Sequence, residues 1–245
     1  MTGRRLVRSV MAQTALEIRL TIQRGESLLV TVVIPSALLI FFASAGILPA
    51  GQRRIEVLLA ATLALAVIST GLVSLSIATA YERYYGVLKR LGATPLPRAG
   101  LVAAKILAVL TIETAQCALL AGIAAIFFGW RPASSFLFVI PLVIAGTTAF
   151  AGIGMAMAGT LRAELTLAAS NGLFLFFLLL GGLYVRLDHL PAGLGAVAGA
   201  LPSAALADAL RAALRASPMP LSSVLILLAW AVLTPLVAAR LFRWE

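Results

Sequence analysis

The charged segment from residue 81 to residue 105, YERYYGVLKRLGATPLPRAGLVAAK, is where residue types and spacing best fit a chemical task. Its first half predicts a short helix that stops at Gly92, just before Thr94 and Pro95. That half carries four charged and four apolar or aromatic side chains: Glu82, Arg83, Lys89 and Arg90 beside Tyr84, Val87, Leu88 and Leu91. A charged helix between two apolar segments either anchors to lipid headgroups or receives a soluble protein partner.

Side chains suited to catalysis or metal binding are scarce. Cys117 and His189 are the single cysteine and the single histidine, so metal-ligand clusters and nucleophilic triads are absent from the sequence. There is also no GxxxxGK[ST] phosphate-binding loop. We therefore expect a protein that is not an enzyme and binds no cofactor itself. Any active transport would take its energy from an ion gradient or from another subunit.

Two polar residues fall inside apolar segments. Glu113 lies in ILAVLTIETAQCALL, and Asn171 follows Ser170 near the start of a later apolar segment. A carboxylate at membrane depth is costly, so it should face protein or water and have a partner or a proton. Glu113 either bridges two helices or takes part in proton coupling or substrate binding, and Asn171 is a candidate for an interhelical hydrogen bond.

The elements that must position these residues are membrane spans. The chain has 245 residues, of which 62% are hydrophobic and only 11% are charged, far from the balance of a soluble domain. A span needs about 20 mostly apolar residues. Six segments meet this requirement, which predicts an all-α, polytopic membrane protein: 27–48, 55–80, 99–128, 136–160, 166–185 and 221–241.

The net charge of +10 follows from topology rather than from nucleic-acid binding. Most of the 19 basic residues lie at the span ends that share one side of the membrane with both termini. The positive-inside rule therefore predicts that both termini, and the segment 81–94, are cytoplasmic.

Two segments outside the spans are predicted to be helical. In residues 1–26, Met11, Ala15, Ile18 and Ile22 share one helical face and Glu17 lies opposite, which favours an amphipathic helix at the membrane interface; a partly disordered basic tail is the alternative. In residues 186–220, the stripe Leu206, Leu210 and Leu214 opposes Asp208, Arg211 and Arg215. Two short helices that cap the outer side are expected there, with an exposed loop as the alternative.

Several motifs resemble a known family. They are ER-x-x-G-x-L-K-R-L-x-x-T-P from Glu82 to Pro95, followed by Lys105 at the start of the third span; GGLYVRLDHLP at 181–191; P-S-x-x-x-x-D-A-L-R at 202–211; and ARLFRWE at the end. The chain resembles the membrane subunit of type-two ABC exporters, a group that includes antibiotic-resistance and polysaccharide-export permeases. It departs from that pattern at Tyr84-Tyr85, where an acidic residue or arginine is frequent, and at Tyr184 and Arg186, where phenylalanine and proline are frequent.

The resemblance implies a division into a cytoplasmic interface segment, 1–26, and a six-span transmembrane domain, 27–245. It implies that 81–94 is a coupling helix seated on a separate ATPase subunit, which would bind ATP and Mg²⁺. The contact residues would be Glu82, Arg83, Tyr84, Gly86, Val87, Leu88, Lys89, Arg90 and Leu91. Arg162 and Glu164 would form a second contact.

By the same resemblance, two permease copies or paralogues pair in a bacterial cell membrane and export a drug, lipid or glycan. A proton-coupled secondary transporter that uses Glu113 is the alternative. The chain has no evident inverted repeat of the kind that many such transporters display.

Overall fold

The computed structural model describes residues 3–23, 25–45, 52–94, 96–182 and 192–242, and within these residues all regular secondary structure is helical. The predicted all-α class is therefore confirmed. The elements are α1 (Gly3–Gln23), α2 (Gly25–Ser44), α3 (Gln52–Ile68), the π-helical turn η1 (Ser69–Ser74), α4 (Leu75–Tyr84), α5 (Val87–Gly92), α6 (Arg98–Phe128), the 3₁₀ turn η2 (Ser134–Phe138), α7 (Val139–Thr160), α8 (Ala163–Leu180), α9 (Ala192–Gly199), α10 (Pro202–Leu214) and α11 (Leu221–Leu241).

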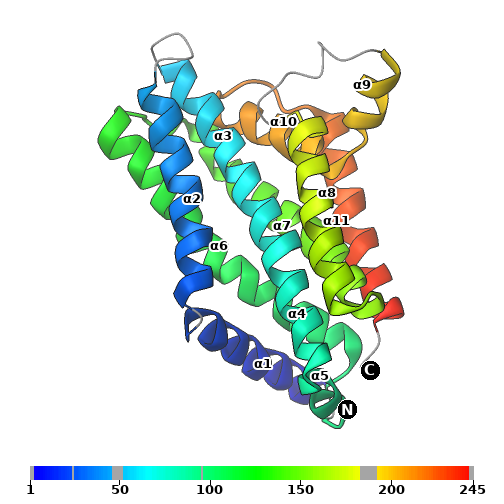
Figure 1. Ribbon diagram of the computed structural model, residues 1–245. Helices are drawn as coiled ribbons and strands as arrows, with labels where there is room; N and C mark the ends of the chain where they lie inside the picture. Colours follow the sequence, from blue (N-terminus) through cyan, green and yellow to red (C-terminus); the bar gives the residue numbers. More distant parts are fainter. Residues whose placement is uncertain (1–2, 24, 46–51, 95, 183–191, 243–245) are drawn as a thin grey trace.

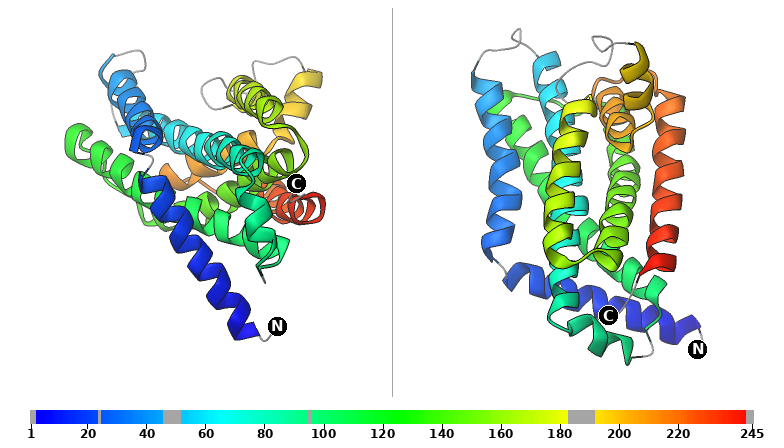
Figure 2. Two further views of the ribbon diagram at one scale, coloured as in Figure 1. Left: turned by 60° about the horizontal axis from the view of Figure 1, so that its bottom comes forward. Right: turned by 45° about the vertical axis from the view of Figure 1, so that its right-hand side comes forward.

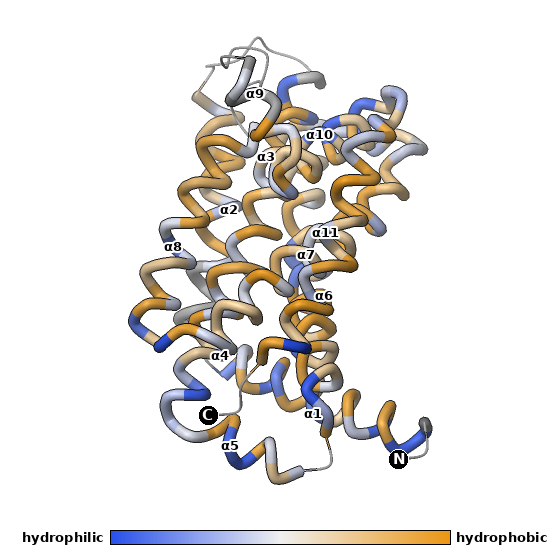
Figure 3. The backbone as a smooth tube through the Cα atoms, turned by 90° about the vertical axis from the view of Figure 1, so that its right-hand side faces the viewer, coloured by the Kyte–Doolittle hydropathy of each residue, from blue (hydrophilic) through white to orange (hydrophobic). Residues whose placement is uncertain are grey.

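Five helical segments among the described residues are long and apolar enough to cross a membrane: Arg54–Tyr84, Arg98–Phe128, Ser135–Thr160, Ala163–Leu180 and Leu221–Leu241. The first of them runs without interruption through α3, η1 and α4. The sixth predicted span corresponds to α2, whose described apolar part, Thr31–Ser44, is shorter than a span. The sixth crossing therefore stays a prediction. The long helices run side by side, and hydrophobic residues dominate along their length (Figure 1, Figure 3).

α7 lies at the centre of the bundle and packs against α3, η1, α4, α6, α8, α10 and α11. Its small residues allow this close approach. A Cβ atom on Gly154 would lie 2.9 Å from the Leu72 carbonyl oxygen in η1, and one on Gly146 would lie 2.9 Å from Leu206 in α10. The core of the bundle is therefore built around the glycine and alanine face of α7.

α10 closes one end of the bundle. It packs against α3, α7 and α11, and its leucine stripe Leu206, Leu210 and Leu214 is fully buried. Arg211 pairs with Asp208 and donates a 2.7 Å hydrogen bond to the carbonyl of Gly182. Two short helices, α9 (Ala192–Gly199) and α10, are present in the described part of the predicted segment, and residues 186–191 lie outside the described residues. Their place on the outer side of the membrane stays a prediction. An exposed loop, the alternative, is wrong for α10, because its apolar face fills the space between three spans.

α1 lies across the opposite end of the bundle, oblique to the spans and close to α5 (Figure 1, Figure 2). Its main contacts are with α6. The predicted N-terminal helix therefore exists in residues 3–23, and a disordered tail does not describe them. The end of the molecule that holds α1 and α5 is called the α5 end below.

The tightest helix contact yields a stability prediction. A Cβ on Gly152 of α7 would clash with Thr234 Oγ1 and would lie 2.6 Å from the Pro235 nitrogen in α11. Thr234 also donates a 2.8 Å hydrogen bond to the Ala149 carbonyl of α7, so α11 cannot retreat without losing that bond. We expect Gly152→Ala to lower stability by about 1–3 kcal/mol through overpacking, measured as a fall in the melting temperature of the detergent-purified protein.

Gly122→Ala in α6 is the matched control, since a Cβ there meets no atom within 4 Å. It should leave the melting temperature unchanged or raise it slightly. Equal melting temperatures for the two variants would contradict the close α7–α11 contact.

Candidate functional site

The segment 81–94 is divided by a sharp turn. α4 continues through Tyr81 and ends at Tyr84, and Gly86 follows in the left-handed conformation (φ 72°). Only then does the six-residue helix α5 begin. The prediction of a single short helix from residue 81 was therefore wrong: the first four residues extend a span, and glycine is the residue that adopts the left-handed turn without strain. The turn and α5 together are called the α5 loop, residues 85–94.

Three side chains that were expected to contact a partner make contacts within this chain. Leu88 is fully buried in a cluster with Leu96 and Leu101. Glu82 is 8% exposed and binds Lys105. Arg83 is half-buried and donates a hydrogen bond to the carbonyl of Leu161. These contacts hold the α5 loop onto the bundle, and the burial of Leu88 and Glu82 corrects the expectation that these two form a partner surface.

The other predicted contact residues lie outward. Tyr84 and Tyr85 are 65% and 71% exposed, and their rings meet edge to face with centroids 5.2 Å apart. Val87, Lys89 and Arg90 are also exposed, and Leu91 is half-buried. A groove of about 460 Å³ opens beside the tyrosines and is lined by Val73, Ser74, Ile77, Ala78, Tyr81, Glu82, Tyr85 and Val87. The outward surface of the α5 loop is therefore aromatic and basic.

The second predicted contact lies next to this surface. Arg162, between α7 and α8, and Glu164, in the first turn of α8, are exposed. They line a hollow of about 230 Å³ together with Ala80, Arg83, Tyr84 and Ala163. The hydrogen bond from Arg83 to Leu161 joins the two segments. The segment 81–94 and the pair Arg162 and Glu164 were predicted as two separate contacts. In the structure they form one continuous surface at the α5 end.

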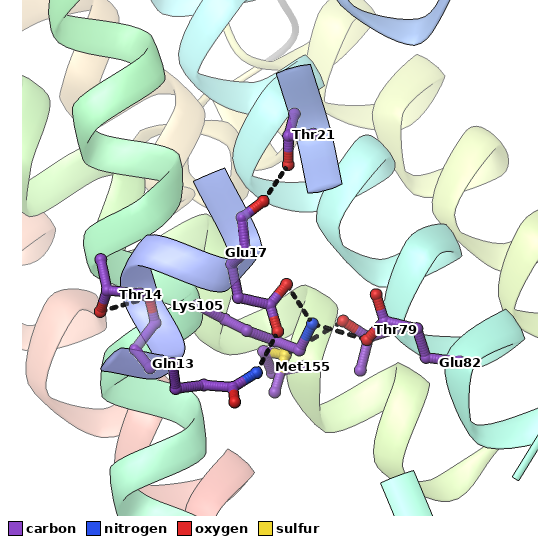
Figure 4. A network of polar contacts seen from close by, with 9 residues as sticks. Gln13, Thr14, Glu17, Thr21, Thr79, Glu82, Lys105 and Met155 are labelled. Atoms are coloured by element: carbon purple, nitrogen blue, oxygen red, sulfur yellow. Dashed lines mark hydrogen bonds and ion pairs between the residues drawn. The ribbon is translucent and has the colours of Figure 1, made fainter. Parts of the chain in front are cut away.

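A buried cluster of charges lies behind this surface (Figure 4). The Lys105 ammonium, on a side chain that is 1% exposed, donates to Glu17 Oε2 at 2.8 Å and to Glu82 Oε2 at 2.7 Å. Gln13 Nε2 donates to the second oxygen of Glu17 at 2.8 Å. These residues come from α1, α4 and α6, so the Glu17–Lys105–Glu82 triad joins three helices at one point.

The triad was missed by sequence reasoning, although a signal was present. Lys105 was noted only as part of the family motif, and Glu17 only as part of the polar face of residues 1–26. A lysine one or two turns inside an apolar segment requires a buried anionic partner. Glu17, which lies opposite an apolar face, and Glu82, at the end of a span, were candidates for that partner.

A cavity of about 70 Å³ adjoins the triad. Its lining includes Glu17, Glu82 and Lys105 and four hydroxyl-bearing residues, Thr21, Thr31, Thr70 and Ser74. Thr70 belongs to the π-helical turn, and its hydroxyl is buried without a hydrogen-bond partner among the described residues. A polar cavity of this size is large enough for water, which would satisfy the remaining polar groups.

Glu113 and Asn171 lie in different surroundings. Glu113 is 1% exposed and accepts a hydrogen bond from the hydroxyl of Thr147, so it links α6 to α7. Asn171 is exposed on α8 and donates a 2.9 Å hydrogen bond to Leu167 of its own helix. The expected interhelical bond of Asn171 is therefore absent within the described part of this chain, and the neighbouring Ser170 makes one to Ser76 at 2.6 Å.

The triad predicts a characteristic pattern of stability. Lys105→Met leaves two buried carboxylates facing each other, and removing one partner of a buried ion pair typically costs about 3–5 kcal/mol. The triple variant Lys105→Met/Glu17→Gln/Glu82→Gln removes all three charges and should recover most of that loss. Thermal unfolding in detergent measures both, with Arg98→Gln at an exposed position of α6 as the control. A triple variant no more stable than Lys105→Met would contradict the charge pairing.

Comparison with known proteins identifies the family of the chain. No curated protein matches the chain. A model of the ABC-2 type transporter family matches residues 9–215, most of the chain, and this match includes α6–α8, the α5 loop and the triad. Such family members are the membrane-spanning permeases of ABC transporters, which are not themselves catalytic and generally work with ATPase subunits. The chain therefore belongs to the ABC-2 type transporter family and is a multi-pass membrane permease subunit.

Proposed function

We propose that this chain forms the translocation path of a bacterial ABC exporter as a dimer and receives two separate ATPase subunits at the α5 end. The observation that carries the proposal is a continuous surface. It runs from the α5 loop through Tyr84 at the end of α4 to Arg162 and Glu164. It combines exposed tyrosines, which are frequent anchors of protein interfaces, with basic side chains that give charge complementarity. Family membership supports the same reading.

The way the α5 loop is held favours transmission of force. Leu88 anchors α5 against the start of α6, and Glu82 ties the end of α4 to Lys105. α4 continues through η1 into α3 as a single span. A displacement of the α5 loop by an ATPase would therefore move the ends of two spans together. ATP and Mg²⁺ would be bound by the partner, and their binding would switch the path between inward and outward access.

The exposed face of α8 supports pairing of two permeases. This helix exposes large apolar side chains along its length: Leu165, Leu167, Leu175, Phe176 and Leu179. Asn171 is exposed among them. A carboxamide is costly against lipid and is better placed against a second subunit or a polar path. We propose that α8 lines the path at the interface between two copies.

We further propose that the α5 end is cytoplasmic in a bacterial cell membrane, since the positive-inside rule favours that side. The substrate is a drug, lipid or glycan, by analogy with the family.

ATPase docking is best tested by changing residues of the α5 loop whose side chains face outward. Reversing Glu82 and Arg83 would be a poor test, because both hold the α5 loop onto this chain. Lys89→Glu/Arg90→Glu changes exposed charges of α5 and leaves the triad and Leu88 intact. Since reversing a buried interfacial charge typically costs about 2–5 kcal/mol, we expect loss of the ABC ATPase that co-purifies with the wild-type permease in mild detergent.

Arg131→Glu/Arg215→Glu is the matched control, because it makes the same charge change at exposed positions that lie outside the α5 loop, between α6 and η2 and at the end of α10. It should retain the ATPase, and all variants should elute as folded protein in size exclusion. An ATPase retained by Lys89→Glu/Arg90→Glu would overturn the docking assignment.

Glu113 provides the test of the proton-coupled alternative. Glu113→Gln keeps the shape and the acceptor for the Thr147 hydroxyl while removing a titratable group. If Glu113 only links α6 to α7, the variant should retain the ATP hydrolysis rate of the purified complex over the whole pH range measured. A pH-dependent loss with unchanged protein yield would instead favour a proton-coupled role.

A further inference from the structure

The amphipathic helix α1 is oriented with its polar side toward the protein. Gln13, Thr14 and Glu17 are buried, and the Thr14 hydroxyl lies 3.3 Å from the Ala104 carbonyl of α6. Large apolar side chains face outward instead: Val7, Met11, Leu16 and Ile22 are 46% to 62% exposed. An ordinary surface helix of a soluble protein has the opposite arrangement.

The outward side of α1 is also strongly basic. Arg4, Arg5, Arg8 and Arg19 are all exposed, and Arg4, Arg8 and Arg19 fall on one stripe at helical spacing. Glu17 is the single acidic residue of α1, and it lies inside, bound to Lys105. The exposed side therefore carries four arginines, with no carboxylate of its own helix to neutralise them. This side is called the arginine face below.

A mixture of arginines and exposed aliphatic side chains matches a phospholipid surface. The aliphatic groups enter the boundary between headgroups and acyl chains, while guanidinium groups bind phosphate oxygens with paired hydrogen bonds. α1 lies across the ends of the spans, where the apolar stretch of the bundle gives way to polar residues (Figure 2, Figure 3). An acidic protein partner would match the arginines, but it would not explain four large aliphatic side chains spread along the same face.

We propose that the arginine face binds anionic phospholipid headgroups and that the Glu17–Lys105–Glu82 triad transmits this binding to the α5 loop. Glu17 lies on the reverse side of the same helix, and Lys105 connects it to Glu82, three residues before the turn that begins at Tyr85. Lipid that holds α1 in place thereby holds the end of α4. That lipid binding would thereby regulate the contact with the ATPase rests on the proposed function, because the α5 loop is the surface assigned to the ATPase.

The test uses the full-length permease without any ATPase, so that its outcome is independent of the docking assignment. The protein is reconstituted in nanodiscs of phosphatidylcholine, with or without added phosphatidylglycerol. Hydrogen–deuterium exchange is measured over residues 3–23 and 85–94. We expect phosphatidylglycerol to slow exchange by about twofold or more in both segments, as stabilised local structure opens less often.

Three variants distinguish lipid binding by the arginine face from transmission of that binding to the α5 loop. Arg4→Gln/Arg5→Gln/Arg8→Gln/Arg19→Gln should lose the response in both segments. Glu17→Gln should keep the response of α1 and lose that of the α5 loop. If Glu17→Gln does not fold, Gln13→Leu, which removes a hydrogen bond that holds the Glu17 carboxylate, serves the same purpose. Arg131→Gln/Arg215→Gln is the control and should respond as wild type.

The result that overturns lipid binding is equal exchange with and without phosphatidylglycerol in the wild-type protein, or a full response in the quadruple arginine variant. An unchanged response of the α5 loop in both Glu17→Gln and Gln13→Leu would overturn transmission through the triad.

Discussion

The pairing of Lys105 with Glu17 and Glu82 is the interaction on which the α5 end depends. A lysine that is 1% exposed cannot remain charged without anionic partners, so its position in α6 requires carboxylates from two other helices. The two carboxylates come from different helices. Glu17 belongs to α1, which lies across the ends of the spans, and Glu82 belongs to the last turn of α4. One ammonium group thereby fixes the position of α1 and the direction in which the chain enters the turn at Gly86.

A second constraint, of shape rather than charge, organises the rest of the bundle. α7 packs against most other helices because glycine and alanine occupy its contact positions. Thr234 adds a hydrogen bond at the closest of these contacts. The two constraints meet along α4, which packs against α7 on one side and carries Glu82 at its end. A closely packed centre and a charge-clamped end suit the displacement of the α5 loop that we propose.

The sequence was sufficient for features that depend on composition and periodicity. The all-helical class, the apolar segments and the buried leucine stripe of α10 follow from hydrophobic spacing alone. It was insufficient where a charged residue has two possible partners. The sequence around Glu82 does not indicate whether its carboxylate binds a lysine 23 residues further along the chain or a residue of another protein. Asn171 poses a similar difficulty, since an amide inside an apolar segment does not reveal which face of the helix it occupies. Leu88 was assigned to the surface because the turn at Gly86, which directs it inward, depends on tertiary packing.

The covering of α7 by α11 is needed to bury the centre of the bundle. Without α11, the groove at Gly152 and one side of α10 would have no covering helix. A chain that lacks residues 221–241 would expose this stripe of glycine and alanine on α7 and would lose the hydrogen bond from Thr234 to the Ala149 carbonyl. Removal of α11 would therefore uncover the centre of the bundle rather than take away a peripheral helix.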